Sequence, residues 1–159
     1  MRLALVVAAA AVMLGAGLLA AAPAMAQDIK TVTKKGDFED VKFELNDAIV
    51  RRGLSVEQDG NIGQMLERTG ADVGSTKPIY KNARFLSFCS ARFSRRMMEA
   101  DPVNLGFCPY VVFIYESVAA PGEIVVGYRT HTPRGNEASR AALAEIDQLL
   151  DGIIKDAVK

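Results

Sequence analysis

The chain has 159 residues, half of them hydrophobic, and its 19 lysine and arginine residues are balanced by 19 aspartate and glutamate residues. A chain of this length can bury the core of one domain without metals or several disulfides. The balanced charge argues against the basic surface with which proteins bind nucleic acid or anionic membranes, so neither is expected as a partner.

The N-terminus has the layout of a secretory signal peptide. A basic start precedes an apolar run from Leu3 to Ala22, and the small-residue triplet Ala24 to Ala26 follows. We expect cleavage after Ala26, which leaves a signal peptide at 1–26 and a single domain at 27–159. The alternative is an uncleaved anchor, because the run is about as long as the ~20 residues of a spanning helix. We expect an exported, periplasmic protein that is soluble after cleavage, without a stable membrane anchor.

The first half of the domain alternates between strand and helix patterns. The spacing of apolar residues changes from two to three or four and then repeats, and glycine or aspartate marks the boundaries. The expected elements are a strand over 29–34, a helix over 38–49 that Asp37 caps and Gly53 ends, a strand over 54–57, a turn at Asp59-Gly60, and a helix over 62–68.

The second half begins with a strand over 83–88 and a helix from Ala91 to Ala100, which Ser90 caps and Asp101-Pro102 closes. Strands over 110–115 and 123–129 are joined by a short turn and therefore form an antiparallel hairpin. Pairing Val118 with Glu123 would place His131 opposite Tyr110. A long helix from 137 to about 158 ends the chain.

This order of elements predicts the α+β class. We expect an antiparallel or mixed β-sheet of about five strands with helices packed on one side. The sequence contains no internal repeat and no interdomain linker.

Both cysteines lie between residues 88 and 109, and each follows a phenylalanine. Cys89 precedes a helix N-terminus, and Arg92, Arg95 and Arg96 follow it, so this position favours a thiolate. Three roles are open for Cys89 and Cys108: a redox or sulfur-handling pair, a structural disulfide, or two buried thiols that serve as small apolar residues. The chain has no Cys-x-x-Cys motif, which disfavours a thioredoxin-like oxidoreductase.

The topology decides whether the two sulfurs meet. If the strands that end at Cys89 and begin at Cys108 are antiparallel neighbours, both cysteines lie at the same edge of the sheet. The hairpin would then bring His131 near them. We therefore expect Cys89, Cys108 and His131 to cluster around the opening of one site at this edge. These three residues are the catalytic candidates.

The other candidate sites carry weaker signals. His131 could act as a base or a metal ligand, although a single histidine at a strand end often faces water. Arg92, Arg95 and Arg96 could bind an anion near the helix N-terminus, or form a solvated face. Met97 and Met98 with the cysteines make a copper(I) site conceivable, but one of two adjacent methionines faces the core by geometry alone. We expect no metal and no cofactor.

From 81 to 112 the sequence resembles the family called domain of unknown function 302, and within it an exported, cysteine-containing subgroup. The positions of the family's characteristic motifs are occupied here by Cys89-Ser90-Ala91, Ala100-Asp101-Pro102 and Phe107-Cys108-Pro109. A looser likeness extends from about Phe38 to Pro133. The resemblance implies a small α+β domain that often self-associates, so a homodimer is one expectation, and it implies no activity.

Two functions remain open. The absence of a complete catalytic constellation favours a non-catalytic binding or interaction module, whose partner would be a small molecule or a protein. The alternative is a thiol-dependent redox or sulfur-handling protein that uses Cys89 with Cys108. The sequence names no substrate or reaction, so it leaves open whether the protein is an enzyme.

Overall fold

The computed structural model describes residues 29–159, so the expected signal peptide and its cleavage site lie outside the described residues. The described part belongs to the α+β class, as predicted. None of its helices has the length and apolarity to span a bilayer. Its elements in chain order are β1 (Ile29–Lys35), α1 (Phe38–Val50), β2 (Val56–Asn61), α2 (Ile62–Thr69), β3 (Tyr80–Phe88), α3 (Ala91–Ala100), the 3-10 helix η1 (Pro102–Phe107), β4 (Tyr110–Ser117), β5 (Glu123–Arg129) and α4 (Glu137–Asp156).

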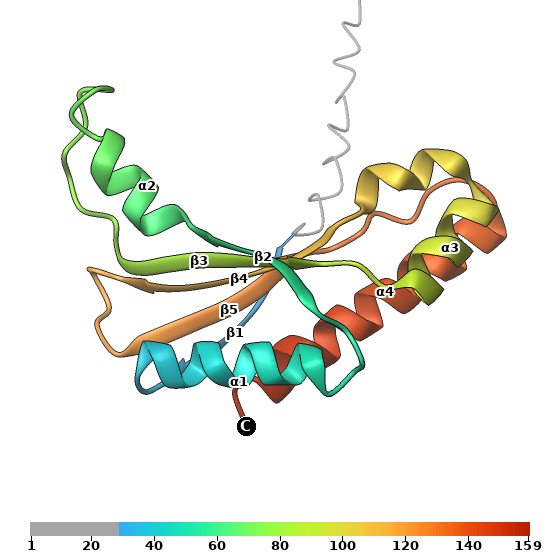
Figure 1. Cartoon of the computed structure of the whole chain (residues 1–159), viewed down its shortest axis with the longest axis horizontal. Helices are drawn as coiled ribbons and strands as arrows, with labels where there is room; N and C mark the ends of the chain where they lie inside the picture. The colour runs from blue at the N-terminus through green and yellow to red at the C-terminus, as the bar shows by residue number, and fades with distance from the viewer. Residues whose placement is uncertain (1–28) are drawn as a thin grey trace, which may run out of the picture.

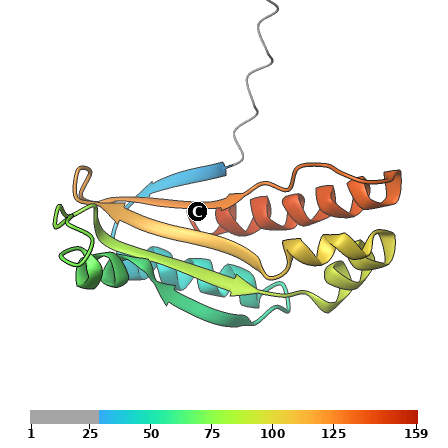
Figure 2. The ribbon, with the colours of Figure 1, turned by 90° about the horizontal axis from the view of Figure 1, so that it is seen from above.

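The five strands form one sheet in the order β1-β5-β4-β3-β2, and all neighbours are antiparallel. The long helices α1 and α4 pack on one face, as predicted, while α2 lies above one end of the other face (Figure 1). Helix α3 and η1 lie beyond the opposite end of the sheet (Figure 2). Within residues 29–159, no helix therefore lies over much of the second face.

The core lies between the sheet and the helices α1 and α4. Each buried leucine, isoleucine or phenylalanine there stabilises the fold by about 1.5–3 kcal/mol relative to an exposed position. Fully buried members include Leu45 and Ile49 of α1, Leu143, Ile146 and Leu150 of α4, and Phe88, Val112, Ile114 and Val126 of the sheet.

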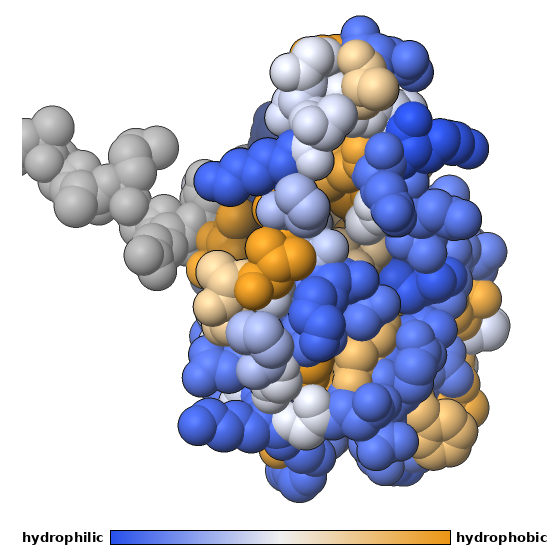
Figure 3. Space-filling view, turned by 90° about the vertical axis from the view of Figure 1, so that its left-hand side faces the viewer, coloured by the Kyte–Doolittle hydropathy of each residue, from blue (hydrophilic) through white to orange (hydrophobic). Residues whose placement is uncertain are grey.

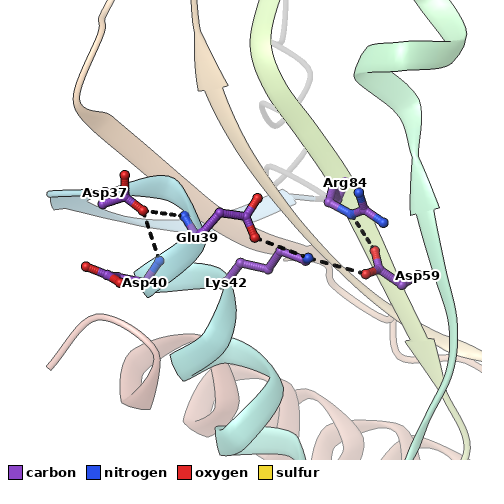
Figure 4. Close-up of polar contacts among 6 residues, drawn as sticks. All are labelled: Asp37, Glu39, Asp40, Lys42, Asp59 and Arg84. Atoms are coloured by element: carbon purple, nitrogen blue, oxygen red, sulfur yellow. Dashed lines mark hydrogen bonds and ion pairs between the residues drawn. The ribbon is translucent and has the colours of Figure 1, made fainter.

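Polar contacts fix the start of α1 and tie it to the sheet (Figure 4). The Asp37 carboxylate caps the helix by accepting the N–H groups of Glu39 and Asp40 at 2.8 and 3.2 Å, as predicted for this cap. Lys42 extends from the helix to Asp59 of β2, and its Nζ lies 3.6 Å from Asp59 Oδ2. Arg84 of β3 donates to the same carboxylate through Nε at 2.6 Å.

The predicted turn at Asp59-Gly60 is wrong, because β2 runs through both residues to Asn61. Asp59 is held in the strand by its two cationic partners. Gly60 lies under the ring of Phe85, where a Cβ atom would be 2.0 Å from Phe85 Cε1. The glycine therefore makes room for a ring from the neighbouring strand, as in close-packed sheets, rather than for a reversal of the chain.

The β4–β5 hairpin differs from the predicted register by one residue. Pairing Val118 with Glu123 would place Val112 opposite Arg129, whereas Val112 pairs with Tyr128. The turn is fixed by Gly122, whose φ of 78° is left-handed and whose N–H donates to Glu116 Oε1 at 2.9 Å.

Candidate functional site

The two cysteines meet at one edge of the sheet. Strands β3 and β4 are antiparallel neighbours with Phe88 opposite Tyr110, so the end of β3 and the start of β4 lie side by side, as expected. Cys89 Sγ and Cys108 Sγ are 2.8 Å apart, and both residues are half-buried free thiols. Since a disulfide bond measures about 2.05 Å, the sulfurs are in contact without being bonded.

Helix α3 brings the chain back from Cys89 to Cys108. It begins and ends at the predicted residues, and Ser90 Oγ caps it by accepting the N–H of Phe93 at 3.4 Å. The chain then returns through η1, where the Asp101 carboxylate accepts the N–H of Val103 at 3.1 Å. The sulfurs are therefore held together by two short helices and not by a mobile loop.

A chain of hydroxyl groups leads from the thiols into the core. Ser94 Oγ lies 3.6 Å from Cys108 Sγ and 3.1 Å from the Tyr110 hydroxyl. Burial raises the pKa of Tyr110 to about 12, so its hydroxyl is neutral and can donate at ordinary pH. The Ser94 hydroxyl can then accept from Tyr110 and donate to Cys108. Negative charge on Cys108 Sγ would thus be met by two donors, the Ser94 hydroxyl and the Cys89 thiol.

The expected thiolate at Cys89 is wrong. Burial, the hydrogen bond with Cys108, and the negative charges of Cys108 and Glu57 raise the pKa of Cys89 to about 12. A bulge between Val56 and Gln58 brings Glu57 toward the thiol, which sequence spacing does not reveal. Cys89 therefore keeps its proton at ordinary pH.

His131 lies beside the residues that flank Cys108. Its ring contacts Phe107 and Tyr110 edge-on, with ring centroids 5.2 and 6.2 Å apart. It is buried instead of facing water, and its Nδ1 lies 2.6 Å from Asp147 Oδ1, a contact that favours the tautomer with the proton on Nδ1. No hydrogen bond joins the ring to either sulfur within residues 29–159. His131 thus contributes to the wall of the site, and its ring is hydrogen-bonded to Asp147 and not to a thiol.

The three predicted anion-binding arginines have separate partners. Arg95 pairs with Glu99 at 2.8 Å and Arg96 with Glu145 at 2.5 Å, while the Arg92 guanidinium lies 5.3 Å from the centre of the Phe93 ring. They do not converge on one site.

Met97 belongs to the hydrophobic core. Met97 is fully buried and lies 4.0 Å from the Tyr110 hydroxyl. In the part of the chain that the structure describes, no three histidine, cysteine, aspartate or glutamate side chains form a group that could hold a metal ion.

Sequence reasoning missed Ser94, Tyr110, Glu57 and Asp147. Ser94 had a signal, because it lies three residues before the buried Met97 and therefore on the inner side of α3. Asp147 had none, since only the packing of α4 against the end of β5 places it next to His131.

The comparisons with known proteins concern the fold. A family model described as "Domain of unknown function DUF302" matches residues 29–157. Among solved structures, the chain is similar to "uncharacterized conserved protein DUF302 from Bacillus stearothermophilus", with a TM-score of 0.68 and 15% sequence identity over 83% of this chain and 99% of that chain. The search of curated proteins found no match.

Proposed function

The chain belongs to the DUF302 family, and on that premise, which gives a fold but no activity, we propose that Cys89 and Cys108 form a reversible dithiol–disulfide couple. The observation that carries the proposal is the 2.8 Å contact between the two sulfurs. Closing the bond requires an approach of less than about 1 Å, since a disulfide measures about 2.05 Å. This is the thiol-dependent alternative rather than the non-catalytic module.

The couple would exchange with a partner disulfide. The Cys108 thiolate attacks one partner sulfur, and the other leaves as a thiolate, which gives a mixed disulfide on Cys108. Cys89 then releases its proton to solvent and attacks Cys108 Sγ, so that the remaining partner sulfur leaves. The dithiol loses two electrons and two protons, and the partner disulfide becomes two thiols. The reverse sequence reduces Cys89–Cys108.

Two features support this division of roles. The raised pKa of Cys89 keeps that thiol protonated, whereas Cys108 Sγ has both Cys89 and Ser94 within hydrogen-bonding distance. A thiolate with hydrogen-bond donors is stabilised, and the thiolate is the attacking species. Cys108 is therefore the nucleophile and Cys89 the resolving thiol.

Equilibration with mixtures of reduced and oxidised dithiothreitol tests the couple. We expect the monomeric chain to change from two alkylated cysteines to none in one two-electron transition, because the sulfurs are already in contact. Alkylation of quenched samples followed by intact-mass measurement gives the fraction in each state. Disulfides found only between chains, or two thiols that stay reduced at the oxidising end, would overturn the proposal.

We also propose that the protein acts outside the cytoplasm, where disulfides persist. The apolar run and the triplet that ends at Ala26 support export. The mature protein is expected to begin at Gln27, and intact-mass measurement of the chain recovered from the periplasmic fraction checks it. Recovery of the full-length chain in the membrane fraction would contradict this expectation.

A further inference from the structure

The sheet face that α1 and α4 leave uncovered carries an aromatic surface. Side chains alternate between the faces of a strand, so Phe85 and Ser87 of β3 lie on this face with Phe113 and Val111 of β4 opposite them. Cys89 follows directly on Phe88 at the end of β3, just beyond Ser87 and Val111 of this face. The central strands of the open face therefore lead directly to the thiol pair.

Two glycines let the rings of this face lie across neighbouring strands. A Cβ atom on Gly127 of β5 would be 2.6 Å from Phe113 Cζ, and one on Gly60 of β2 would be 2.0 Å from Phe85 Cε1. Phe113 thus spreads over β5, and Phe85 spreads over β2. The two rings lie flat on the sheet and form a broad aromatic surface, which we call the aromatic floor.

A groove of about 330 Å³ lies on this floor. Ile62 at the start of α2 and Ile29 of β1 are among its walls, and Tyr80 and Tyr115, whose ring centroids are 5.3 Å apart, lie at its far end. Among residues 29–159, the only charged residue that lines it is Arg84, which is paired with Asp59. Seen from the end where α2 lies, the surface is largely hydrophilic, and apolar patches stand out against it (Figure 3).

We propose that this open face binds an extended apolar polypeptide segment that carries the cysteine on which the thiol pair acts. The inference rests on the proposed dithiol couple and names its substrate class. Cys89 is four positions after Phe85, which corresponds to about 13 Å at 3.3 Å per residue. Val111 lies between the groove and the thiols and is 41% exposed, so the path between them is apolar and open.

The distance from the groove to the sulfurs distinguishes a small disulfide from an extended polypeptide as the bound molecule. A small disulfide that fills the groove would not span about 13 Å to the sulfurs, whereas an extended chain covers that distance with about four residues. The favoured substrate therefore has an aromatic or large aliphatic side chain four positions from its reactive cysteine. The side chain binds over Phe85 and Phe113, and the cysteine then lies at Cys108.

Peptides activated with thionitrobenzoate provide the test. Each carries one cysteine in a mixed disulfide with thionitrobenzoate, and either phenylalanine or serine four positions away. Attack by Cys108 joins it to the peptide and releases thionitrobenzoate, and attack by Cys89 then releases the peptide thiol. Release of thionitrobenzoate is followed by its absorbance. We expect the phenylalanine peptide to react about tenfold faster, the gain from about 1.4 kcal/mol of apolar binding.

A matched pair of surface variants locates the effect. Val111→Lys places a charge on the path and is expected to bring the ratio of the two rates close to one. Val50→Lys changes another exposed valine, on α1 and 51% exposed, and should leave the tenfold ratio unchanged. The ratio cancels any general effect of the added charge on the thiols.

The outcomes separate this inference from the proposed function. Equal rates for the two peptides in the wild type, or a tenfold ratio that survives Val111→Lys, overturns the docking surface while the couple stands. Failure of the wild type to form the Cys89–Cys108 disulfide in the dithiothreitol mixtures overturns the couple itself, and the docking surface with it.

Discussion

Cys108→Ser is expected to slow reaction with hydroxyethyl disulfide by about 100-fold or more. A hydroxyl group does not attack a disulfide sulfur, and the remaining Cys89 thiol is half-buried and subject to the negative charge of Glu57, so its thiolate is scarce. Cys89→Ser is expected to react at close to the wild-type rate and then stop at the mixed disulfide. Intact-mass measurement of quenched samples distinguishes the two, because only the second variant gains one hydroxyethylthio group.

The double variant Cys89→Ser/Cys108→Ser sets the background rate. A fast mixed disulfide in Cys108→Ser together with an unreactive Cys89→Ser would reverse the two roles. It would mean that the N-terminus of α3 acts on Cys89 more strongly than burial and Glu57 do. The experiment therefore weighs two electrostatic effects of opposite sign on one thiol.

The sequence predicted those parts of the fold that local chemistry determines. Asp37 and Ser90 were identified as caps because a short polar side chain before an apolar helical stripe has few other uses. The bounds of β5 and the shared edge of the cysteines followed from a short hairpin and the antiparallel order. These inferences needed no knowledge of distant contacts.

The errors have long-range causes. The dipeptide Asp59-Gly60 has turn chemistry, but Arg84, Lys42 and the Phe85 ring, all far away in sequence, keep it in a strand. The charge state expected at Cys89 failed for the same reason, since its pKa is raised first by burial and then by Cys108 and Glu57, which are distant in sequence. The helix N-terminus is one of several influences on the pKa of that thiol. The others are visible only once the sheet is assembled.

Closing the bond between Cys89 and Cys108 is expected to stabilise the domain by about 3 kcal/mol. The two residues are 19 positions apart, and a cross-link over a loop of that size removes about this much conformational entropy from the unfolded chain. For a domain of this length, the midpoint of thermal unfolding should rise by about 10 °C. Urea and thermal unfolding of the oxidised protein, compared with the same protein in reductant, measure the difference.

The double variant Cys89→Ser/Cys108→Ser is the control, since its midpoint should not depend on reductant. A gain near 3 kcal/mol would mean that the folded chain accepts the bond without strain, as expected for sulfurs that η1 and α3 already hold in contact. An oxidised form no more stable than the reduced one would show that strain in the fold offsets the entropic gain. By linkage, a folded state that favours the disulfide also makes the dithiol a better reductant than the unfolded chain. The stability difference and the redox equilibrium of the folded protein are thus two measurements of one free energy, and they must agree in sign.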